Sequence, residues 1–231
     1  MKFACAVVLS AAASCIGTAL HAQAPASGER SIHVTIIPRA GLVIPDRYMY
    51  EQYANFSGDG PVEWTNGSLG RALVVGVGCE VGYADRRLML RGEVLRSLDG
   101  WLSAAHSVVV PRQLFEAPRV ETTWLDAPVA MTMVSVQLVL PTRLTLWGSE
   151  PYVLAGVAGK RYDVGDPTTV NEVDAILPSS GTTWGADIGA GITFPLFGAS
   201  LDLQGRDAVN RYWGKTEHDF VVSTGVAVRI R

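Results

Sequence analysis

The feature that most constrains the fold of this chain is an alternation of apolar residues with polar or glycine residues. It is clearest in TWGADIGAGITFPL (183–196), where apolar residues occupy every second position from Trp184 to Phe194. Successive side chains of a β-strand point to opposite faces, so this period predicts strands; the helical period of 3.6 residues is hard to find anywhere. Eight segments are predicted as strands: 31–44, 72–83, 87–98, 129–140, 151–162, 183–196, 199–212 and 218–231.

The length of these segments indicates the kind of β protein. They have roughly 10–14 residues, whereas strands of soluble proteins usually have about 5–6. A tilted strand of about 9–11 residues crosses the hydrocarbon core of a bilayer. An even number of antiparallel strands can close into a barrel that leaves no unpaired edge in lipid. We therefore predict an all-β fold, an eight-stranded antiparallel up-and-down transmembrane β-barrel, within residues 25–231.

The connections between the predicted strands alternate in length. Short turns are expected at 84–86 and 197–198 and a medium one at 141–150. On the other side we expect long loops, except for a short last one, at 45–71, 99–128, 163–182 and 213–217. Short periplasmic turns and long extracellular loops are typical of outer-membrane barrels, so both termini are expected on the periplasmic side.

Aromatic residues gather near both ends of the predicted strands, as in the aromatic girdles of outer-membrane barrels. Near the long-loop ends these are Tyr48, Tyr50, Tyr53, Trp64, Trp101, Trp124, Tyr162, Trp184, Tyr212 and Trp213. Near the short-turn ends they are Tyr83, Trp147, Tyr152, Phe194 and Phe197.

The N-terminal segment reads as a secretory signal. Lys2 precedes an apolar run, FACAVVLSAAA (3–13), and Ala22-Gln23-Ala24 has the small-x-small pattern of a cleavage site. We predict that residues 1–24 are a signal peptide cleaved after Ala22 or Ala24. A lipoprotein signal ending at Cys15 is disfavoured, because the residues before it lack the usual leucine. Cys79 is then the single cysteine of the mature chain, which excludes an internal disulfide and a cysteine-based zinc site.

Composition excludes several other classes of protein. The chain has 19 basic and 22 acidic residues and a net charge of −3, which argues against a nucleic-acid-binding protein. Beyond the N-terminal segment, no apolar run reaches the roughly 18 residues of a membrane-spanning helix.

Two segments resemble strands of known outer-membrane proteins. PYVLAGVA (151–158) resembles the fifth strand of small bacterial barrels, and HDFVVSTGVAVR (218–229) resembles their last strand. Over residues 31–231 the chain resembles the eight-stranded OmpA/OmpX/OmpW-like group. It departs from that group at its last residue, Arg231, where the family usually has an aromatic residue. The resemblance implies the bacterial outer membrane as location, and outer-membrane lipid and the assembly machinery as partners. The oligomeric state is left open, with a monomer as one of the alternatives.

The polar faces of the predicted strands identify the candidate site. If the apolar faces meet lipid, the polar faces fill the lumen, which in an eight-stranded barrel is only wide enough for side chains. Buried charges need partners. The charged residues on these faces are four basic and four acidic ones, so they predict a network of ion pairs that is structural or lines a pore. Glycines on the same faces leave room for water, which keeps a pore open as an alternative. The predicted lumen residues are Arg39, Glu80, Arg91, Glu93, Asp187, Asp202, Arg206 and Arg229.

No catalytic, cofactor or metal site is expected. His106-Ser107 lies in a long loop and His218-Asp219 begins the last strand, and neither resembles the His-x-Ser-Asn pattern of the outer-membrane lipid A acylases and deacylases. No cluster of His, Asp and Glu has the spacing of metal ligands. We therefore expect a non-enzymatic barrel with a structural or surface-interaction role through its long loops. The alternatives are a narrow porin-like channel for small solutes and a soluble secreted barrel that binds an apolar ligand inside.

Overall fold

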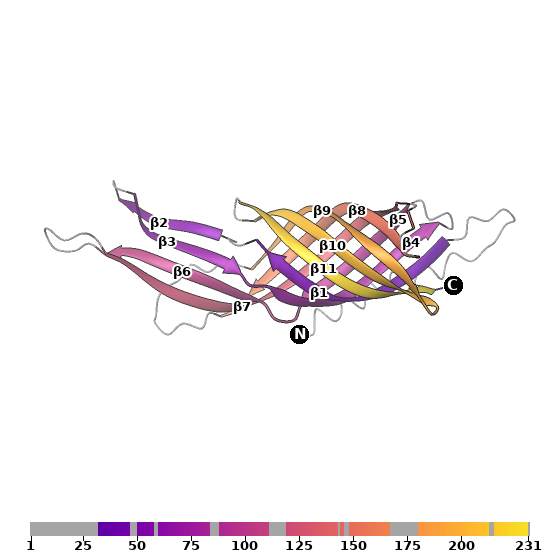
Figure 1. Ribbon diagram of the computed structural model, residues 1–231. Helices are drawn as coiled ribbons and strands as arrows, with labels where there is room; N and C mark the ends of the chain where they lie inside the picture. The colour runs from indigo at the N-terminus through magenta and orange to yellow at the C-terminus, as the bar shows by residue number, and fades with distance from the viewer. Residues whose placement is uncertain are drawn as a thin grey trace.

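The computed structural model describes residues 32–46, 50–57, 60–83, 88–110, 119–142, 144–145, 148–166, 180–212 and 215–230 (Figure 1). The predicted signal peptide lies outside these residues. In the described part of the chain there is no helix whose length and apolar character would let it cross a membrane.

Eight strands form a closed antiparallel ring in the order β1–β4–β5–β7–β8–β9–β10–β11, and β11 returns to β1. Each of the eight predicted segments overlaps one of these strands, so the predicted fold is confirmed. We call the end with the β4–β5, β7–β8 and β9–β10 connections the turn end, and the opposite one the extension end. The ring strands are β1 (Ile32–Pro45), β4 (Ala72–Tyr83), β5 (Met89–Ser97), β7 (Arg119–Pro141), β8 (Glu150–Val164), β9 (Gly181–Leu196), β10 (Ala199–Tyr212) and β11 (Lys215–Ile230).

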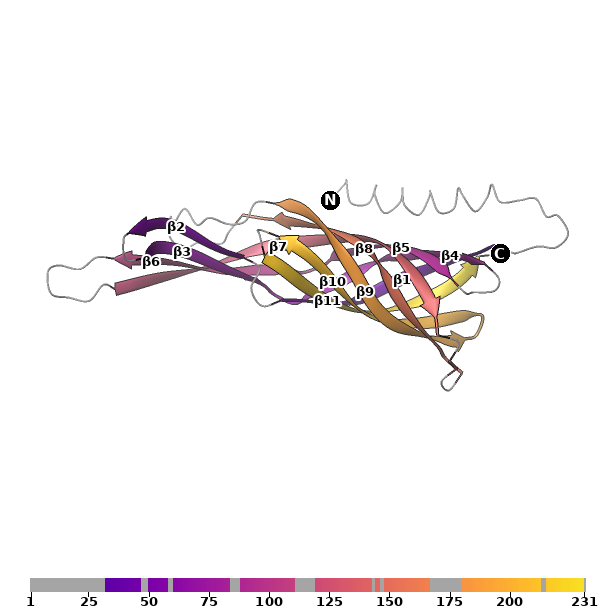
Figure 2. The same cartoon turned by 90° about the horizontal axis from the view of Figure 1, so that it is seen from above.

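Three further strands continue the wall beyond the ring. They are β2 (Tyr50–Ser57), β3 (Gly60–Leu69) and β6 (Trp101–Val110), and they pair in the order β2–β3–β6–β7. Strand β7 belongs to both parts: residues 119–128 pair with β6, and residues 129–141 pair with β8. The result is a four-stranded extension sheet that projects from one end of the barrel (Figures 1 and 2).

The prediction that 45–71 and 99–128 are loops is therefore wrong in large part. Strand β3 reads GPVEWTNGSL, with glycine, proline and asparagine that are depleted in strands. The inner side of β6 combines Leu102 and Ala104 with His106, so its apolar alternation is short. The sequence signal for these strands is therefore weaker than that of the ring strands.

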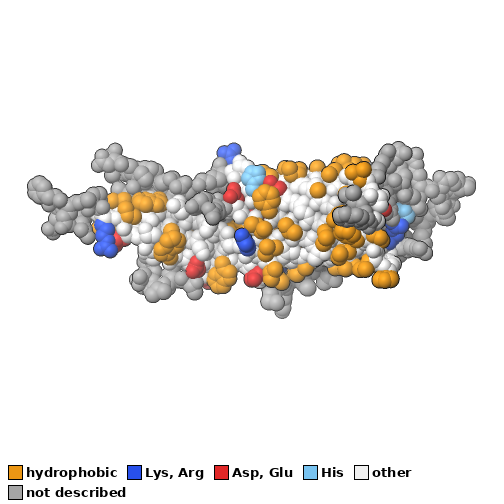
Figure 3. All heavy atoms as spheres, viewed as in Figure 1, with side chains coloured by type: hydrophobic (Ala, Val, Ile, Leu, Met, Phe, Trp, Pro, Cys, Tyr) orange, Lys and Arg blue, Asp and Glu red, His pale blue; other side chains and the backbone are white. Residues whose placement is uncertain are grey.

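The barrel wall is apolar outside, and its inner face is polar around the centre of the lumen and apolar toward the extension end. In β7 the exposed Val134, Val136 and Leu138 alternate with Ser135 and Gln137, which are at most 2% exposed. Hydrophobic side chains cover much of the barrel surface in Figure 3, and charged ones gather near its junction with the extension and at the ends. This is the reverse of the soluble ligand-binding barrel, which would have an apolar interior and a polar exterior.

Two of the predicted girdle aromatics point inward instead. Tyr152 and Tyr162 are at most 4% exposed, and both lie on the inner face of β8. The segment 151–162 is apolar or small on both sides, so hydropathy alone did not indicate its facing. Trp184 and Phe197 do lie exposed, near the extension end and the turn end of the ring.

Candidate functional site in the barrel lumen

The centre of the lumen holds a chain of ion pairs drawn from four strands, β1, β5, β9 and β10. Glu93 on β5 receives two arginines: Arg39 Nε lies 2.5 Å from its Oε2, and Arg206 Nη2 lies 2.5 Å from its Oε1. Arg39 also reaches Asp202 (3.1 Å), and Arg206 reaches Asp187 (2.7 Å). All five side chains are at most 2% exposed. These charges are therefore shielded from water and are neutralised by one another.

A second arginine centre lies nearer the turn end. Arg91 Nη2 lies 2.6 Å from Glu80 Oε2 and 3.0 Å from Asp202 Oδ2, so Asp202 joins the two halves of the network. Arg91 Nη1 donates to Gln204 (2.6 Å) and to the hydroxyl of Tyr152 (3.0 Å). That hydroxyl donates in turn to Asp202 Oδ1 (2.6 Å), and the guanidinium lies 4.9 Å from the Tyr152 ring centroid.

Neutral side chains complete the hydrogen bonding of the network. Ser223 accepts from Arg39, and Ser135 accepts from Arg206 at 2.8 Å. Gln137 Nε2 donates to Asp187 Oδ2 at 2.7 Å. Unpaired buried charges are strongly destabilising, whereas charges with several partners are tolerated. The lumen therefore acts as a polar core that crosslinks the barrel wall.

The structure brings together seven of the eight predicted lumen residues. Six of them are almost fully buried, and Glu80 is partly buried at the edge facing the turn end. Arg229 lies apart from this network. It is exposed near the C-terminal end of β11 and lines the mouth of the cavity at the turn end.

A second charged cluster, which the sequence analysis missed, lies nearer the extension end. Lys160 Nζ is fully buried, 2.5 Å from Asp219 Oδ2 and 2.6 Å from the carbonyl of Ala208, and it also donates to Asn210. The Tyr162 hydroxyl donates to the same Asp219 oxygen at 2.9 Å. Asp219 lies on the polar face of its predicted strand. The segment 151–162 has apolar or small residues on both faces, so its sequence did not show whether Lys160 faces the lumen.

Apolar side chains fill the lumen around this second cluster. Leu95 and Met133 lie one inward position beyond Glu93 and Ser135, toward the extension end, and are fully buried. They belong to a cluster that continues onto the inner face of the extension sheet through Leu102. The same cluster includes Val43, Val74, Ala104, Leu125, Ala127, Val129, Met131, Ala158, Tyr162, Ala208 and Val221.

Two of the inward glycines, Gly191 and Gly76, lie against large neighbouring side chains. A Cβ at Gly191 would collide with the Tyr152 ring, and one at Gly76 would collide with Leu95 and the neighbouring backbone. Glycine at these two positions is required by close approach, since any larger residue would displace a packed group. These two glycines, which were counted as space for a pore, are thus part of the packing.

A polar cavity of about 330 Å³ enters the lumen from the turn end. It is lined by Glu80, Arg91, Tyr152 and Asp202 of the network and by Arg229 at its mouth. This vestibule would admit small polar solutes as far as the ion pairs.

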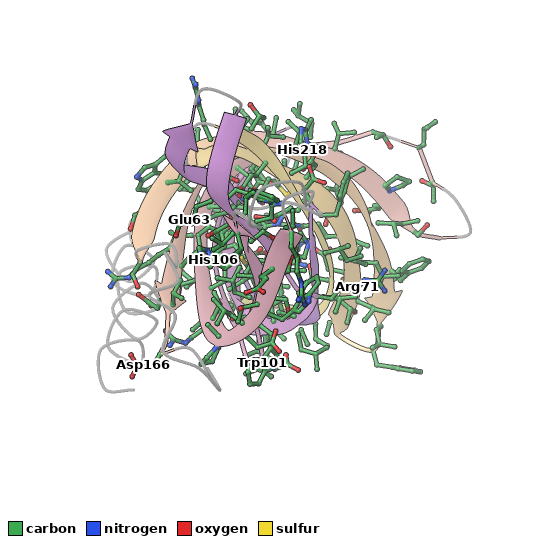
Figure 4. All side chains as sticks on the ribbon, turned by 90° about the vertical axis from the view of Figure 1, so that its left-hand side faces the viewer. Glu63, Arg71, Trp101, His106, Asp166 and His218 are labelled. Atoms are coloured by element: carbon green, nitrogen blue, oxygen red, sulfur yellow. The ribbon has the colours of Figure 1, made fainter. Side chains whose placement is uncertain are left out.

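The histidines noted in the sequence lie away from the lumen network. His106, 4% exposed, contacts Thr65 Oγ1 through Nδ1 (2.9 Å) and Glu63 Oε1 through Nε2 (3.3 Å); Figure 4 shows His106 and Glu63 near the middle of the view down the extension. Thr65 is 1% exposed, so its hydroxyl is closed to a substrate. His218 instead pairs with Asp207 at 2.8 Å on the outer side of the wall. Among the described residues no three His, Cys, Asp or Glu side chains form a group that could hold a metal ion.

Comparison with solved structures supports the barrel architecture. The outer membrane protein OprG from Pseudomonas aeruginosa superposes with a TM-score of 0.56 at 12% sequence identity, over 88% of this chain and 98% of that one. Neisserial surface protein A (NspA) gives a TM-score of 0.44 at 13% identity, over 86% and 97% of the two chains. No family model and no curated protein matches the sequence.

These similarities concern the fold. The chain has the architecture of the small eight-stranded outer-membrane barrels, as seen in the outer membrane protein OprG. At 12% identity, the similarity to OprG extends to the fold and does not assign a role to any lumen residue of this chain.

Proposed function

We propose that this protein resides in the bacterial outer membrane as a non-enzymatic barrel and presents its extension sheet outside the cell as an interaction surface. One observation carries the proposal. The lumen is packed with ion pairs and apolar side chains, while the long connections build an ordered sheet of four strands beyond the ring. A rigid scaffold that displays exposed segments is a common way to present binding residues.

The outer-membrane location is supported by the apolar wall and by the comparisons. In this orientation the turn end faces the periplasm and the extension faces outward. Outer-membrane lipid surrounds the wall, the assembly machinery inserts the chain, and the barrel acts as a monomer. The membrane fraction should contain a band that shifts on a denaturing gel after boiling, because a closed barrel resists detergent until it is heated. A band in the soluble periplasm without such a shift would refute the location.

A narrow channel is the second candidate, and the vestibule at the turn end is the observation that favours it. The protein reconstituted in planar bilayers should show no steady conductance if the packed lumen is closed, with an open porin as positive control. Conductance whose ion selectivity changes in Arg91→Glu, which alters the innermost charge of the vestibule, would favour the channel instead. A silent Arg91→Glu variant that still shows the heat-dependent gel shift would support the closed barrel.

A further inference from the structure

The outer wall of the barrel contains an apolar groove that none of the proposed roles uses. It has a volume of about 820 Å³ and lies across β4, β1, β11 and β10, with one contribution from the residue after β5. Its outward-facing lining comprises Ala40, Leu42, Leu73, Val75, Leu98, Leu203, Gly205, Val222 and Thr224.

Strand register explains why the wall is hollow here. Leu42 lies opposite Leu73 on one side and Val222 on the other, and Val222 lies opposite Gly205. The neighbouring row places Ala40 between Val75 and Thr224. Large side chains therefore border small ones, and a Cβ at Gly205 would meet no atom within 4 Å.

The groove lies toward the extension end of the ring. Leu73 is near the start of β4, and its backbone N–H donates to Asp99 at 3.0 Å, just beyond the end of β5. Arg71 is exposed two residues before Leu73, just ahead of the start of β4 and nearer the extension. Figure 4 places Arg71 at the periphery of the barrel.

We propose that this groove binds an acyl chain of an anionic glycolipid of the outer leaflet, with Arg71 near its phosphate. The inference rests on the proposed outer-membrane location, because the extension end must face the outer leaflet. Two features favour this occupant. The groove is continuous with the apolar outer wall of the ring, and Arg71 is exposed toward the extension end, where the lipid headgroups would lie.

The physical basis is packing rather than the hydrophobic effect. Lipid tails are as apolar as leucine, so transfer from bulk lipid to the groove gains little hydration free energy. A groove left unfilled would lose dispersion contacts with its lining, and a flexible chain seated in it restores them. The Arg71 guanidinium adds a charge-assisted hydrogen bond to a phosphate oxygen, which selects anionic lipids. Asp99, Asp207 and His218 also lie at this level, so the local charge is mixed. Of the nearby cations, Arg96 lies opposite Val75 and donates to Thr132, whereas Arg71 is exposed just before β4.

The chain offers a matched pair of variants to test this. Gly205→Phe fills the groove, and Gly92→Phe places the same ring on the outward side of β5, where a Cβ also meets no atom within 4 Å. Each variant is refolded into vesicles of phosphatidylethanolamine with a minor fraction of lipid A, re-extracted in mild detergent, and analysed by mass spectrometry for lipid retained per protein. The boiled and unboiled gel bands report insertion separately.

We expect wild type and Gly92→Phe to retain lipid A, and Gly205→Phe to retain at least fivefold less. Arg71→Gln should lower retention of lipid A severalfold and leave retention of phosphatidylethanolamine unchanged. Two outcomes with inserted protein would refute lipid binding in the groove and leave the membrane location intact. One is equal retention of lipid A by wild type and Gly205→Phe, and the other is an equal loss of lipid A in both glycine variants. Wild-type protein that does not insert and shows no gel shift would refute both the groove and the membrane location.

Discussion

Strand β7 runs through two regions that treat their side chains differently. In the barrel its outward residues Val134, Val136 and Leu138 are apolar and its inward Ser135 and Gln137 are polar. In the extension the inward Leu125 and Ala127 are buried and apolar, whereas the outward Asp126 accepts a hydrogen bond from Ser103 at 2.7 Å. The change on the inner side falls within the ring itself: Val129, Met131 and Met133 are still buried and apolar, and the polar stretch begins at Ser135.

The two regions also differ in how closely their charged side chains are paired and how far they are exposed to solvent. Inside the ring, carboxylates and guanidiniums lie at 2.5–3.1 Å from partners that are nearly all inaccessible to water. On the extension, Arg119 and Glu121 are 3.9 Å apart, with side chains more than half exposed. Removing one partner should therefore be severe in the first region and mild in the second.

The largest effect is expected for Glu93→Ala in the lumen. The change leaves Arg39 and Arg206 without their closest carboxylate, and loss of one partner of a buried pair costs about 3–5 kcal/mol. Urea titration of the protein in vesicles should report a correspondingly lower free energy of unfolding. A loss below about 1 kcal/mol would mean that water reaches the network, since exposed pairs contribute only that much.

Lys160→Met should come next, because it leaves Asp219 buried without its cation while filling a similar volume. We expect a loss of about 3 kcal/mol or slightly more, at the lower end for a buried pair. The double variant Lys160→Met/Asp219→Asn should recover most of it, since the amide oxygen can still accept from Tyr162. Double-mutant analysis of the urea midpoints provides the measurement, and losses that simply add would contradict the pairing.

A smaller and more local effect is expected in the extension for His106→Leu. The change removes the hydrogen-bond partner of buried Thr65, which costs about 1–3 kcal/mol. Limited proteolysis should cut the extension faster while the heat-dependent gel shift of the ring stays unchanged. If the shift is lost as well, the extension and the ring unfold as one unit.

The smallest effect is expected for Glu121→Ala on the exposed side of the extension. Its pair with Arg119 is long and solvated, so the change should alter stability by about 0–1 kcal/mol. This variant is the control for Glu93→Ala, with the same substitution in the other region. A loss comparable to that of Glu93→Ala would mean that the extension buries this pair against another surface.

Sequence reasoning succeeded where the bilayer imposes a pattern. The ring strands were predicted because lipid demands apolar residues at every second position, and seven network residues were identified as the charged members of the opposite faces. Lys160 was missed because small and apolar residues cover both faces of its strand. The extension strands were missed because their apolar alternation is short and their sequences contain glycine, proline and asparagine.

By itself the sequence determined that this chain forms long alternating strands in an even-numbered ring, because alternation is a local property imposed by the surroundings of each face. The tertiary structure decided which charge meets which. Arg39 and Asp202 are 163 residues apart, and Lys160 and Asp219 are 59 apart. Strand register and closure bring them together, and side-chain volumes decide whether the space between them holds water or packed atoms. No local pattern encodes these distances.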